Sequence, residues 1–344
     1  MREVMKKNLK IILGIAIITL LMVGFFVYKT IMDRTVDKFV QISDMNVPRI
    51  GHTTTLLKDG RVLIIGGYRA EKKAEIYDPI NNKFFLIDDT NFEHYLEHLT
   101  FLMPDGKVVV IDKDGIETFD PVTNKFSITG KMLIPRRYFA ATKLSNNKIL
   151  ITGGYEEKQG HPLVAQAELC DLVKYKCVFA SKMEIPRIFH ETVLLPNGEI
   201  AIIGGETRDN KWNRNYPINV DLYNPEIDKF SHGGNIKTPR IHPILVLLKN
   251  GKILILGGYQ KGENLNKHIR VVELYDPKDQ ETSILKDFIP YDDAIKLSNG
   301  KILLIGNTKN SSIFEIYDPA AEDFKLIDKK TLTKIIFYKI LFTK

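Results

Sequence analysis

Hydrophobic and polar residues alternate along the chain in a pattern that recurs six times between residues 38 and 326. In the first copy, Pro48-Arg49 opens a short segment, Asp59-Gly60 makes a turn, and an apolar run at 62–65 ends in Gly66-Gly67. Later copies repeat this order, and each then reaches a turn of the Asp-Pro type. These turns start at Asp78, Asp120, Asp171, Asn224, Asp276 and Asp318. Their spacing of 42 to 53 residues indicates a repeat architecture.

Four short strands fit within each period. Asp-Gly at 59–60 and 105–106, and Asn-Gly at 197–198, 250–251 and 299–300, are typical of tight hairpins. The second strand of most copies is continuously apolar, as in 253–256, which predicts burial on both faces. One four-stranded sheet cannot bury both faces alone, but sheets packed around an axis can, and that arrangement is a β-propeller.

The period and the double glycine, at 66–67, 153–154, 204–205 and 257–258, resemble the kelch repeat. The shorter WD repeat, with its Trp-Asp signature, does not match. The resemblance covers about residues 38–326 and implies an all-β fold, a six-bladed kelch-type β-propeller.

The two ends of the repeat region leave the closure of the ring open. Residues 38–43 match the fourth strand of a repeat and are expected to complete or cap the last sheet. The last copy has its own fourth strand at 324–327, and the apolar tail 331–344 could form another strand. Six blades with a redundant strand and a truncated seventh blade therefore both remain, and the first is favoured because no further double glycine follows. We assign 35–330 to the propeller and 331–344 to a tail or closing strand.

Residues 11–28 contain no charged side chain and are long enough to cross a bilayer as a helix. Arg2, Lys6, Lys7 and Lys10 precede them, which predicts a cytoplasmic N-terminus and an extracytoplasmic propeller. A cleaved signal peptide is the alternative, but the segment after Gly24 lacks the small residues of a cleavage site. Residues 1–34 are thus expected to form a basic stub and a signal anchor, which makes this a single-pass membrane protein.

The net charge of +7 agrees with this topology. Residues 1–34 contribute +4 of it, which leaves about +3 for the propeller. This excess is too small to indicate a nucleic-acid partner.

The two cysteines, Cys170 and Cys177, stand at the repeat positions of Tyr77 and Phe84. They replace an aromatic pair on the third and fourth strands, so they can form a disulfide if they face each other in an oxidising compartment. Two buried free thiols are the alternative. No histidine lies near them in the repeat, so we expect no metal site and no cofactor.

Arginine and histidine recur where the chain enters the first strand of a blade. The candidates for a ring around the central funnel are Arg49, Arg136, Arg187, Arg240, His52, His98 and His190. Such a ring could bind a carboxylate or an acidic sugar. The alternative is that each side chain hydrogen-bonds backbone carbonyls between blades, and it is favoured because catalytic residues should break the symmetry.

Loop lengths do break the symmetry. The connections between the second and third strands of blades three, four and five are long, and that of blade four contains the single tryptophan. The candidate binding residues on this loop face are Trp212, Arg208, Arg214, Tyr216, Lys267 and Arg270. Aromatic and arginine side chains are enriched in binding sites, although Trp212 could equally pack against its own blade.

The resemblance to kelch propellers implies a module that binds a protein or a glycan, and this is the main hypothesis. The alternative is a propeller enzyme acting on sugars, similar to the sialic acid mutarotase group or, less closely, to galactose oxidase-like copper enzymes. Those copper enzymes need two histidines, two tyrosines and a cysteine bonded to a tyrosine, and no Tyr-His pair stands at a strand start here. No phosphate-loop or Ser-His-Asp signature is visible. The oligomeric state stays open.

Overall fold

The computed structural model describes residues 43–327 apart from 210, 262–265, 288–290, 298 and 308–311. These residues form six antiparallel sheets of four strands each, and no helix occurs among them. The six sheets follow one another along the chain, and each corresponds to one copy of the repeat. The fold is therefore an all-β, six-bladed propeller.

The strands of each blade are numbered along the chain. Blade 1 contains β1 (Thr53–Leu56), β2 (Val62–Ile65), β3 (Ala74–Asp78) and β4 (Lys83–Leu86). Blade 2 contains β5 (Leu99–Leu102), β6 (Val108–Asp112), β7 (Gly115–Asp120) and β8 (Lys125–Gly130). Blade 3 contains β9 (Arg137–Lys143), β10 (Lys148–Tyr155), β11 (Gln166–Asp171) and β12 (Lys176–Lys182).

The second half of the chain continues in the same way. Blade 4 contains β13 (Glu191–Leu194), β14 (Ile200–Ile203), β17 (Asn219–Asn224) and β18 (Lys229–Asn235). Blade 5 contains β19 (Ile244–Leu247), β20 (Ile253–Leu256), β23 (Val271–Asp276) and β24 (Glu281–Asp287). Blade 6 contains β25 (Tyr291–Lys296), β26 (Ile302–Asn307), β27 (Ser312–Asp318) and β28 (Asp323–Leu326). Two small hairpins, β15 (Thr207–Arg208) with β16 (Arg214–Asn215) and β21 (Tyr259–Lys261) with β22 (Asn266–His268), extend from blades 4 and 5.

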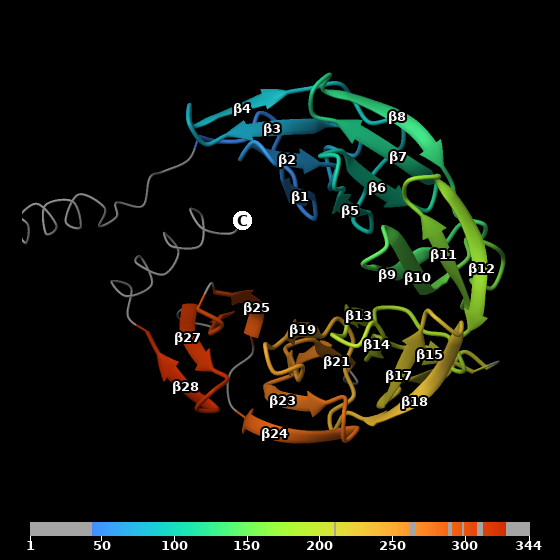
Figure 1. Cartoon of the computed structure of the whole chain (residues 1–344), viewed down its shortest axis with the longest axis vertical. Helices are drawn as coiled ribbons and strands as arrows, with labels where there is room; N and C mark the ends of the chain where they lie inside the picture. Colours follow the sequence, from blue (N-terminus) through green and yellow to red (C-terminus); the bar gives the residue numbers. More distant parts are fainter. Residues whose placement is uncertain are drawn as a thin grey trace, which may run out of the picture. The chain divides into compact units, whose positions relative to one another are not determined.

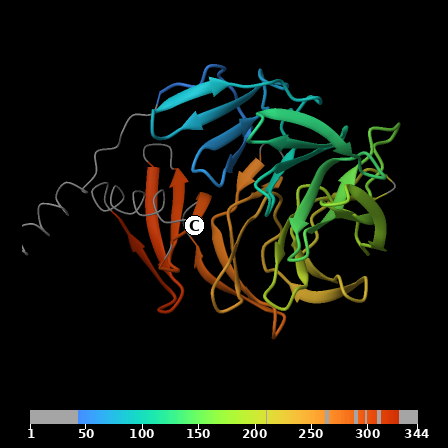
Figure 2. The same ribbon diagram turned by 45° about the horizontal axis from the view of Figure 1, so that its top comes forward.

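The first strand of every blade lies toward a common centre and the fourth strand lies outermost (Figure 1). Turning the molecule shows the twist of each sheet from its inner to its outer strand (Figure 2). Hydrogen bonds join inner strands of neighbouring blades, as from Thr55 Oγ1 to Thr100 Oγ1 at 2.9 Å and from Thr142 Oγ1 to Thr192 Oγ1 at 2.5 Å.

The hydrophobic core lies between the blades. Five clusters of buried side chains fill the five interfaces from blade 1 to blade 6. The second strands of blades 2 to 5 contribute to the clusters on both sides. β6, β14 and β20 are buried along their whole length. Their continuous apolar sequences are thus explained by contact with a blade on each face.

The double glycine lets the loop of one blade approach the next blade closely. Gly153 has φ +63°, and a Cβ atom there would lie 2.2 Å from the carbonyl oxygen of Arg187. The N–H of Gly154 donates to that same oxygen at 3.0 Å. A side chain at Gly153 would therefore push blades 3 and 4 apart.

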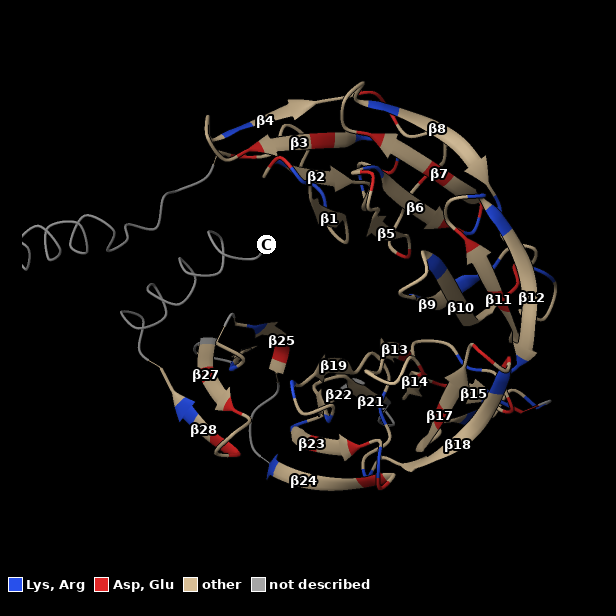
Figure 3. Ribbon diagram, in the orientation of Figure 1, with Lys and Arg blue, Asp and Glu red and all other residues tan. Residues whose placement is uncertain are grey.

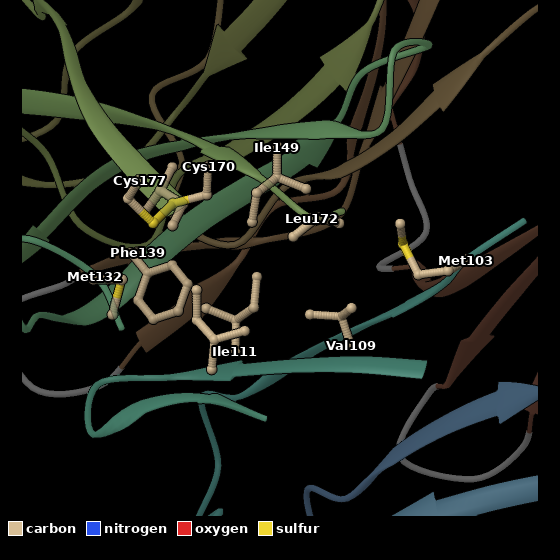
Figure 4. Packing of buried hydrophobic residues seen from close by; sticks show 11 residues of the cluster. Met103, Val109, Ile111, Met132, Phe139, Ile149, Cys170, Leu172 and Cys177 are labelled. Atoms are coloured by element: carbon tan, nitrogen blue, oxygen red, sulfur yellow. A yellow bond between two sulfur atoms is a disulfide. The ribbon is translucent and has the colours of Figure 1, made fainter. Parts of the chain in front are cut away.

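Aromatic pairs connect the two outer strands of four blades, as predicted. Tyr77 and Phe84 are directly opposed on β3 and β4, with ring centroids 4.8 Å apart. Cys170 and Cys177 hold the same register on β11 and β12, and in the structure they form a disulfide. The disulfide packs with Met132, among other residues, in the core between blades 2 and 3 (Figure 4).

Several predictions concern residues outside the described part of the chain. They are the membrane span at 11–28, the stub at 1–34, most of the closing strand at 38–43 and the tail at 331–344. Within the described residues, no helix has the length and hydropathy needed to span a membrane.

Ser43, the last residue of the predicted closing strand, is described. It donates from its backbone N–H to Asn82 Oδ1 at 3.2 Å and from its Oγ to the Asn82 carbonyl. Ser181 on β12, the outer strand of blade 3, makes the same two bonds to Asp228 of blade 4. Ser43 thus contacts blade 1 as the outer strand of a preceding blade would.

Side chains of both charges are interspersed over the blades (Figure 3). The outer strands β4, β8, β12 and β18 carry lysine and no acidic residue, whereas β24 and β28 carry both signs.

Candidate functional site

Arginine side chains at the entry to blades 1, 3, 4 and 5 are bound within their own blades. Arg136 Nη1 donates to the carbonyls of Gly153, at 3.1 Å, and of Gln166, at 2.8 Å. Arg136 Nη2 contacts Glu168 Oε1 at 2.5 Å. The equivalent acidic partners of Arg49, Arg187 and Arg240 are Glu75, Asp221 and Glu273.

All four guanidinium groups are buried, and burial lowers the pKa values of Arg136, Arg187 and Arg240 even though an acidic partner opposes the shift. Their donors are therefore used to hold each blade to the loop that precedes it, and they do not face a shared funnel. His98 and His190 are buried as well, while His52 is half-buried. Burial lowers the pKa of His98 to about 4 and of His190 to about 3, so both are neutral at physiological pH.

Blade 2 departs from this scheme because a histidine replaces the arginine. Counting along the repeat puts Tyr95 at this point, but the structure places His94 there. The carbonyl of His94 accepts from the N–H of Gly67, as the carbonyl of Arg187 does from Gly154. The count was wrong by one residue because blade 2 has one more residue before His98 than blade 4 has before His190.

His94 is fully buried between two carboxylates. Its Nδ1 lies 2.9 Å from Asp112 Oδ2 and its Nε2 lies 2.5 Å from Glu117 Oε1. Burial alone would lower the pKa of His94, but the hydrogen bonds and charges of Asp112 and Glu117 outweigh burial and raise it. Both nitrogens then carry protons, and His94 acts as an imidazolium that holds the two carboxylates in place.

A cavity of about 620 Å³ lies above blade 2. It exists because β6 and β7 are joined by Lys113 and Asp114 alone, whereas blades 3, 4 and 5 carry long connections at this level. Asp112 at the end of β6, and Glu97 in the segment before β5, both line it.

Glu97 lies in the segment that contains the extra residue of blade 2. Its side chain is only 10% exposed and lies 3.5 Å from Arg137 Nη1. Burial raises the pKa of Glu97 despite the opposing charge of Arg137, and the nearby charge of Asp112 adds to the rise. Tyr138 hydrogen-bonds to Glu97, and burial together with this carboxylate raises the pKa of Tyr138 to about 12.

Cationic and acidic side chains line the cavity in equal number, five of each. Lys73, Lys113 and Arg137 are paired with carboxylates at its edge. Arg69 and Lys72 also line it, and neither forms an ion pair with a carboxylate of the described residues. An acidic ligand could therefore be met by two cations that are not already neutralised.

The predicted loop-face residues are only partly brought together. Arg208, Arg214 and Trp212 all belong to the β15–β16 hairpin and the loop at its tip, and Tyr216 follows it. The guanidinium group of Arg208 lies 5.7 Å from the centroid of the Trp212 ring, and Trp212 is 53% exposed. Lys267 lies on β22 of blade 5 and Arg270 is exposed beside it.

The chain is similar in sequence to two curated oxidases and in fold to two solved structures. It is 25% identical over 272 residues to galactose oxidase of Gibberella zeae, which covers 70% of this chain and 40% of that protein. It is 24% identical over 271 residues to aldehyde oxidase GLOX1 of Arabidopsis thaliana, covering 65% and 44%. The chain thus spans about two fifths of the length of these curated relatives. No family model matches it.

Two solved structures share the fold. A fungal alcohol oxidase of the AA5 family, in complex with copper, superposes with a TM-score of 0.60 at 17% identity over 75% of this chain and 58% of that one. A structure of YjhT superposes with a TM-score of 0.55 at 16% identity over 69% and 84%. These neighbours make the kelch-type resemblance plausible and support a propeller enzyme better than the main hypothesis of a binding module.

Copper radical chemistry does not fit the described residues. Both cysteines are joined in one disulfide, so neither can be bonded to a tyrosine. The tyrosine that would precede a histidine at a strand start is not present at the start of blade 4, where Phe189 precedes His190. The buried His190 is also already bonded, because its Nε2 is 2.8 Å from Thr152 Oγ1. His94, His98 and Asp112 do lie within 4.8 Å of one another, but both nitrogens of His94 are already bound to carboxylates.

Sequence reasoning missed the three residues of blade 2 that break the repeat, namely His94, Glu97 and Asp112. Asp112 had a visible signal, because Ile111-Asp112 replaces the double glycine. The only sequence signal for His94 and Glu97 is the one extra residue before His98. That signal can be recognised only when it is known that the carbonyl of His94 accepts a hydrogen bond from Gly67 of the previous blade.

Proposed function

We propose that this chain is a propeller enzyme that interconverts the ring forms of a sugar by acid–base catalysis at the cavity above blade 2. The observation that carries the proposal is that Glu97 and Asp112 line one cavity in contrasting surroundings. Glu97 is buried beside Tyr138, and Asp112 is hydrogen-bonded to His94. Two carboxyl groups in different surroundings are what an acid and a base require.

The reaction needs one proton donor and one proton acceptor. Asp112 accepts the proton of the anomeric hydroxyl while Glu97 donates a proton to the ring oxygen, and the bond between the anomeric carbon and the ring oxygen breaks. The open-chain carbonyl compound rotates and closes again by the reverse transfers. No atom or electron is gained or lost, so neither a metal ion nor a redox cofactor is required.

The unpaired cations Arg69 and Lys72 favour an acidic sugar, as does the resemblance to the sialic acid mutarotase group. The relationship to galactose oxidase supports a sugar as the substrate class, but the disulfide and Phe189 do not support its copper chemistry.

The test is anomer exchange measured by magnetisation-transfer NMR, with the full chain added to N-acetylneuraminate or galactose. We expect wild-type protein to accelerate exchange and chelator treatment to leave the rate unchanged. Glu97→Gln and Asp112→Asn should each lower the rate by about 100-fold or more. Because the active form of Glu97 is protonated, the rate should fall as the pH rises through its raised pKa.

Glu226→Gln is the matched control, since Glu226 is an exposed carboxyl group of blade 4 outside the cavity. Circular dichroism checks that Asp112→Asn, which loses a bond to His94, still folds. If wild-type protein does not accelerate exchange for either sugar, or if Glu97→Gln is as active as Glu226→Gln, the proposal is wrong.

A further inference from the structure

A second cavity, of about 480 Å³, lies between the loops of blades 3 and 4. The segment from Gln159 to Leu163 forms one side, the tip of the β15–β16 hairpin forms the other, and Pro186 also lines it. It shares no lining residue with the cavity above blade 2.

The hairpin that carries Trp212 is held firmly at its base. Glu206, which is 1% exposed, accepts from Arg208 Nε at 3.0 Å and from Arg214 Nη1 at 3.2 Å. The backbone of Glu206 is also paired with Ile188 of the segment before β13. The position of the hairpin is therefore fixed by the body of blade 4.

The tip of the hairpin is fixed as well. Asp209 Oδ1 accepts from the N–H groups of Lys211 and Asn213, at 2.8 and 2.9 Å, and Asp209 Oδ2 accepts from Asn213 Nδ2. Trp212 has φ +66°, a left-handed conformation that costs a non-glycine residue free energy. The indole is half-exposed beside the hydrogen bonds of Asp209.

The opposite side of the cavity reaches the edge of the indole at Gly160. A Cβ atom there would be 3.9 Å from Trp212 Cζ2, which is an ordinary van der Waals contact. His161 is held edge-on against Tyr155, with centroids 5.1 Å apart. Gln159 and His161 add planar polar groups around an apolar surface.

The charges around this cavity are already balanced. Arg208 is paired with Glu206, and Asp209 is bound by its own loop. A ligand with a strong charge of either sign would find no unpaired partner here. An aromatic face with uncharged hydrogen-bonding groups around it instead suits a ring that is apolar on its faces and hydroxylated at its edge.

We propose that the cavity between Trp212 and the segment 159–163 is a binding site for a neutral pyranose unit of a glycan. The indole packs against the face of the sugar ring, while Gln159 and His161 bond its hydroxyl groups. This inference does not depend on the proposed catalytic site, because it uses other residues and needs no reaction.

Trp212 is the only tryptophan of the chain, so its fluorescence reports on this site without background. The full chain in a polyoxyethylene detergent, which has no sugar headgroup, is titrated with lactose, maltotriose and diacetylchitobiose. We expect at least one of them to change the emission in a saturable way.

Isothermal titration calorimetry then measures the affinity of variants for that saccharide. Trp212→Ala should bind at least about tenfold more weakly, and Trp212→Phe, which keeps an aromatic face, should bind with intermediate affinity. Phe85→Ala is the matched control, because Phe85 is also an exposed aromatic residue, at 48%, but lies on the outer strand β4. Its affinity should equal that of wild type.

The inference is overturned if none of the three saccharides changes the emission, or if Trp212→Ala binds as tightly as Phe85→Ala. It is also overturned if the emission responds to a tryptophan-free peptide library and to no saccharide. Loss of anomer exchange in the Glu97→Gln variant would leave saccharide binding at Trp212 intact, so the two proposals can fail separately.

Discussion

At the scale of single residues, the same position has different roles in different blades. Arg136 and its counterparts are buried and paired with an acidic residue on the third strand, so their charge holds the blade together. In blade 2, His94 makes the equivalent contact with Glu117. A shorter side chain that titrates in the physiological range thus replaces a permanent cation at one point of the repeat.

This replacement predicts a pH-dependent stability. The pKa of His94 is raised in the folded protein, so its contribution to stability is complete below the unfolded pKa of about 6.5 and is lost as the pH rises through the folded pKa. His94→Arg restores a permanent cation. We expect the free energy of unfolding of wild type to fall relative to His94→Arg as the pH is raised above about 6.5, measured by urea denaturation.

His232→Arg is the control for that measurement, because His232 is exposed on β18. The free energy of unfolding of His232→Arg should change with pH in the same way as that of wild type. A His94→Arg variant whose stability runs parallel to wild type would show that His94 is not protonated in the folded protein.

At the scale of elements, the β11–β12 hairpin shows that one position of the repeat can hold either a pair of aromatic rings or a disulfide. Other blades pack two rings there, as Phe119 and Phe126 do at 5.0 Å. Blade 3 has the disulfide, which joins two cysteines seven residues apart in the sequence and so closes a small loop.

We expect Cys170→Ser with Cys177→Ser to lower the free energy of unfolding by about 2 kcal/mol, because a short loop gives a modest entropic gain. Cys170→Tyr with Cys177→Phe should recover part of this loss by restoring the aromatic pair. Denaturation of both variants under oxidising conditions, with reduced wild type for comparison, measures the effect. If the serine variant is as stable as oxidised wild type, the disulfide does not stabilise this hairpin.

The connections between strands decide where ligands can bind. The short turn after β6 leaves the cavity above blade 2 open. The long β15–β16 hairpin of blade 4 forms one side of the second cavity, opposite the loop of blade 3. Both features come from loop length on an otherwise regular scaffold, which is where propellers commonly place their specificity.

At the scale of the whole molecule, the apolar segment 11–28 and the basic residues before it still predict an anchored protein with the propeller outside the cytoplasm. The disulfide is consistent with an oxidising compartment. We expect the full chain to stay in the membrane fraction after carbonate extraction. Externally added protease should digest the propeller in intact spheroplasts, and a cytoplasmic protein in the same cells is the control. Protection of the propeller would contradict this topology.

The sequence by itself determined the six copies of the repeat, their strands and the pairing of the outer aromatic residues. Each of these follows from local periodicity and turn residues, which act over a few positions and repeat six times. The register of Tyr77 with Phe84, and of Cys170 with Cys177, could be predicted because a hairpin fixes which residues face each other.

Only the tertiary structure decided which residues form the candidate sites. His94, Glu97 and Asp112 lie close together because the segment before β5 converges with the end of β6. Trp212 borders a cavity whose other wall belongs to blade 3. The sequence favoured a structural role for the arginines over a ring of ligands, but it did not identify their acidic partners, which lie about 30 residues away on the third strand. Contacts between segments this far apart depend on how the sheets pack, and local patterns carry no information about them.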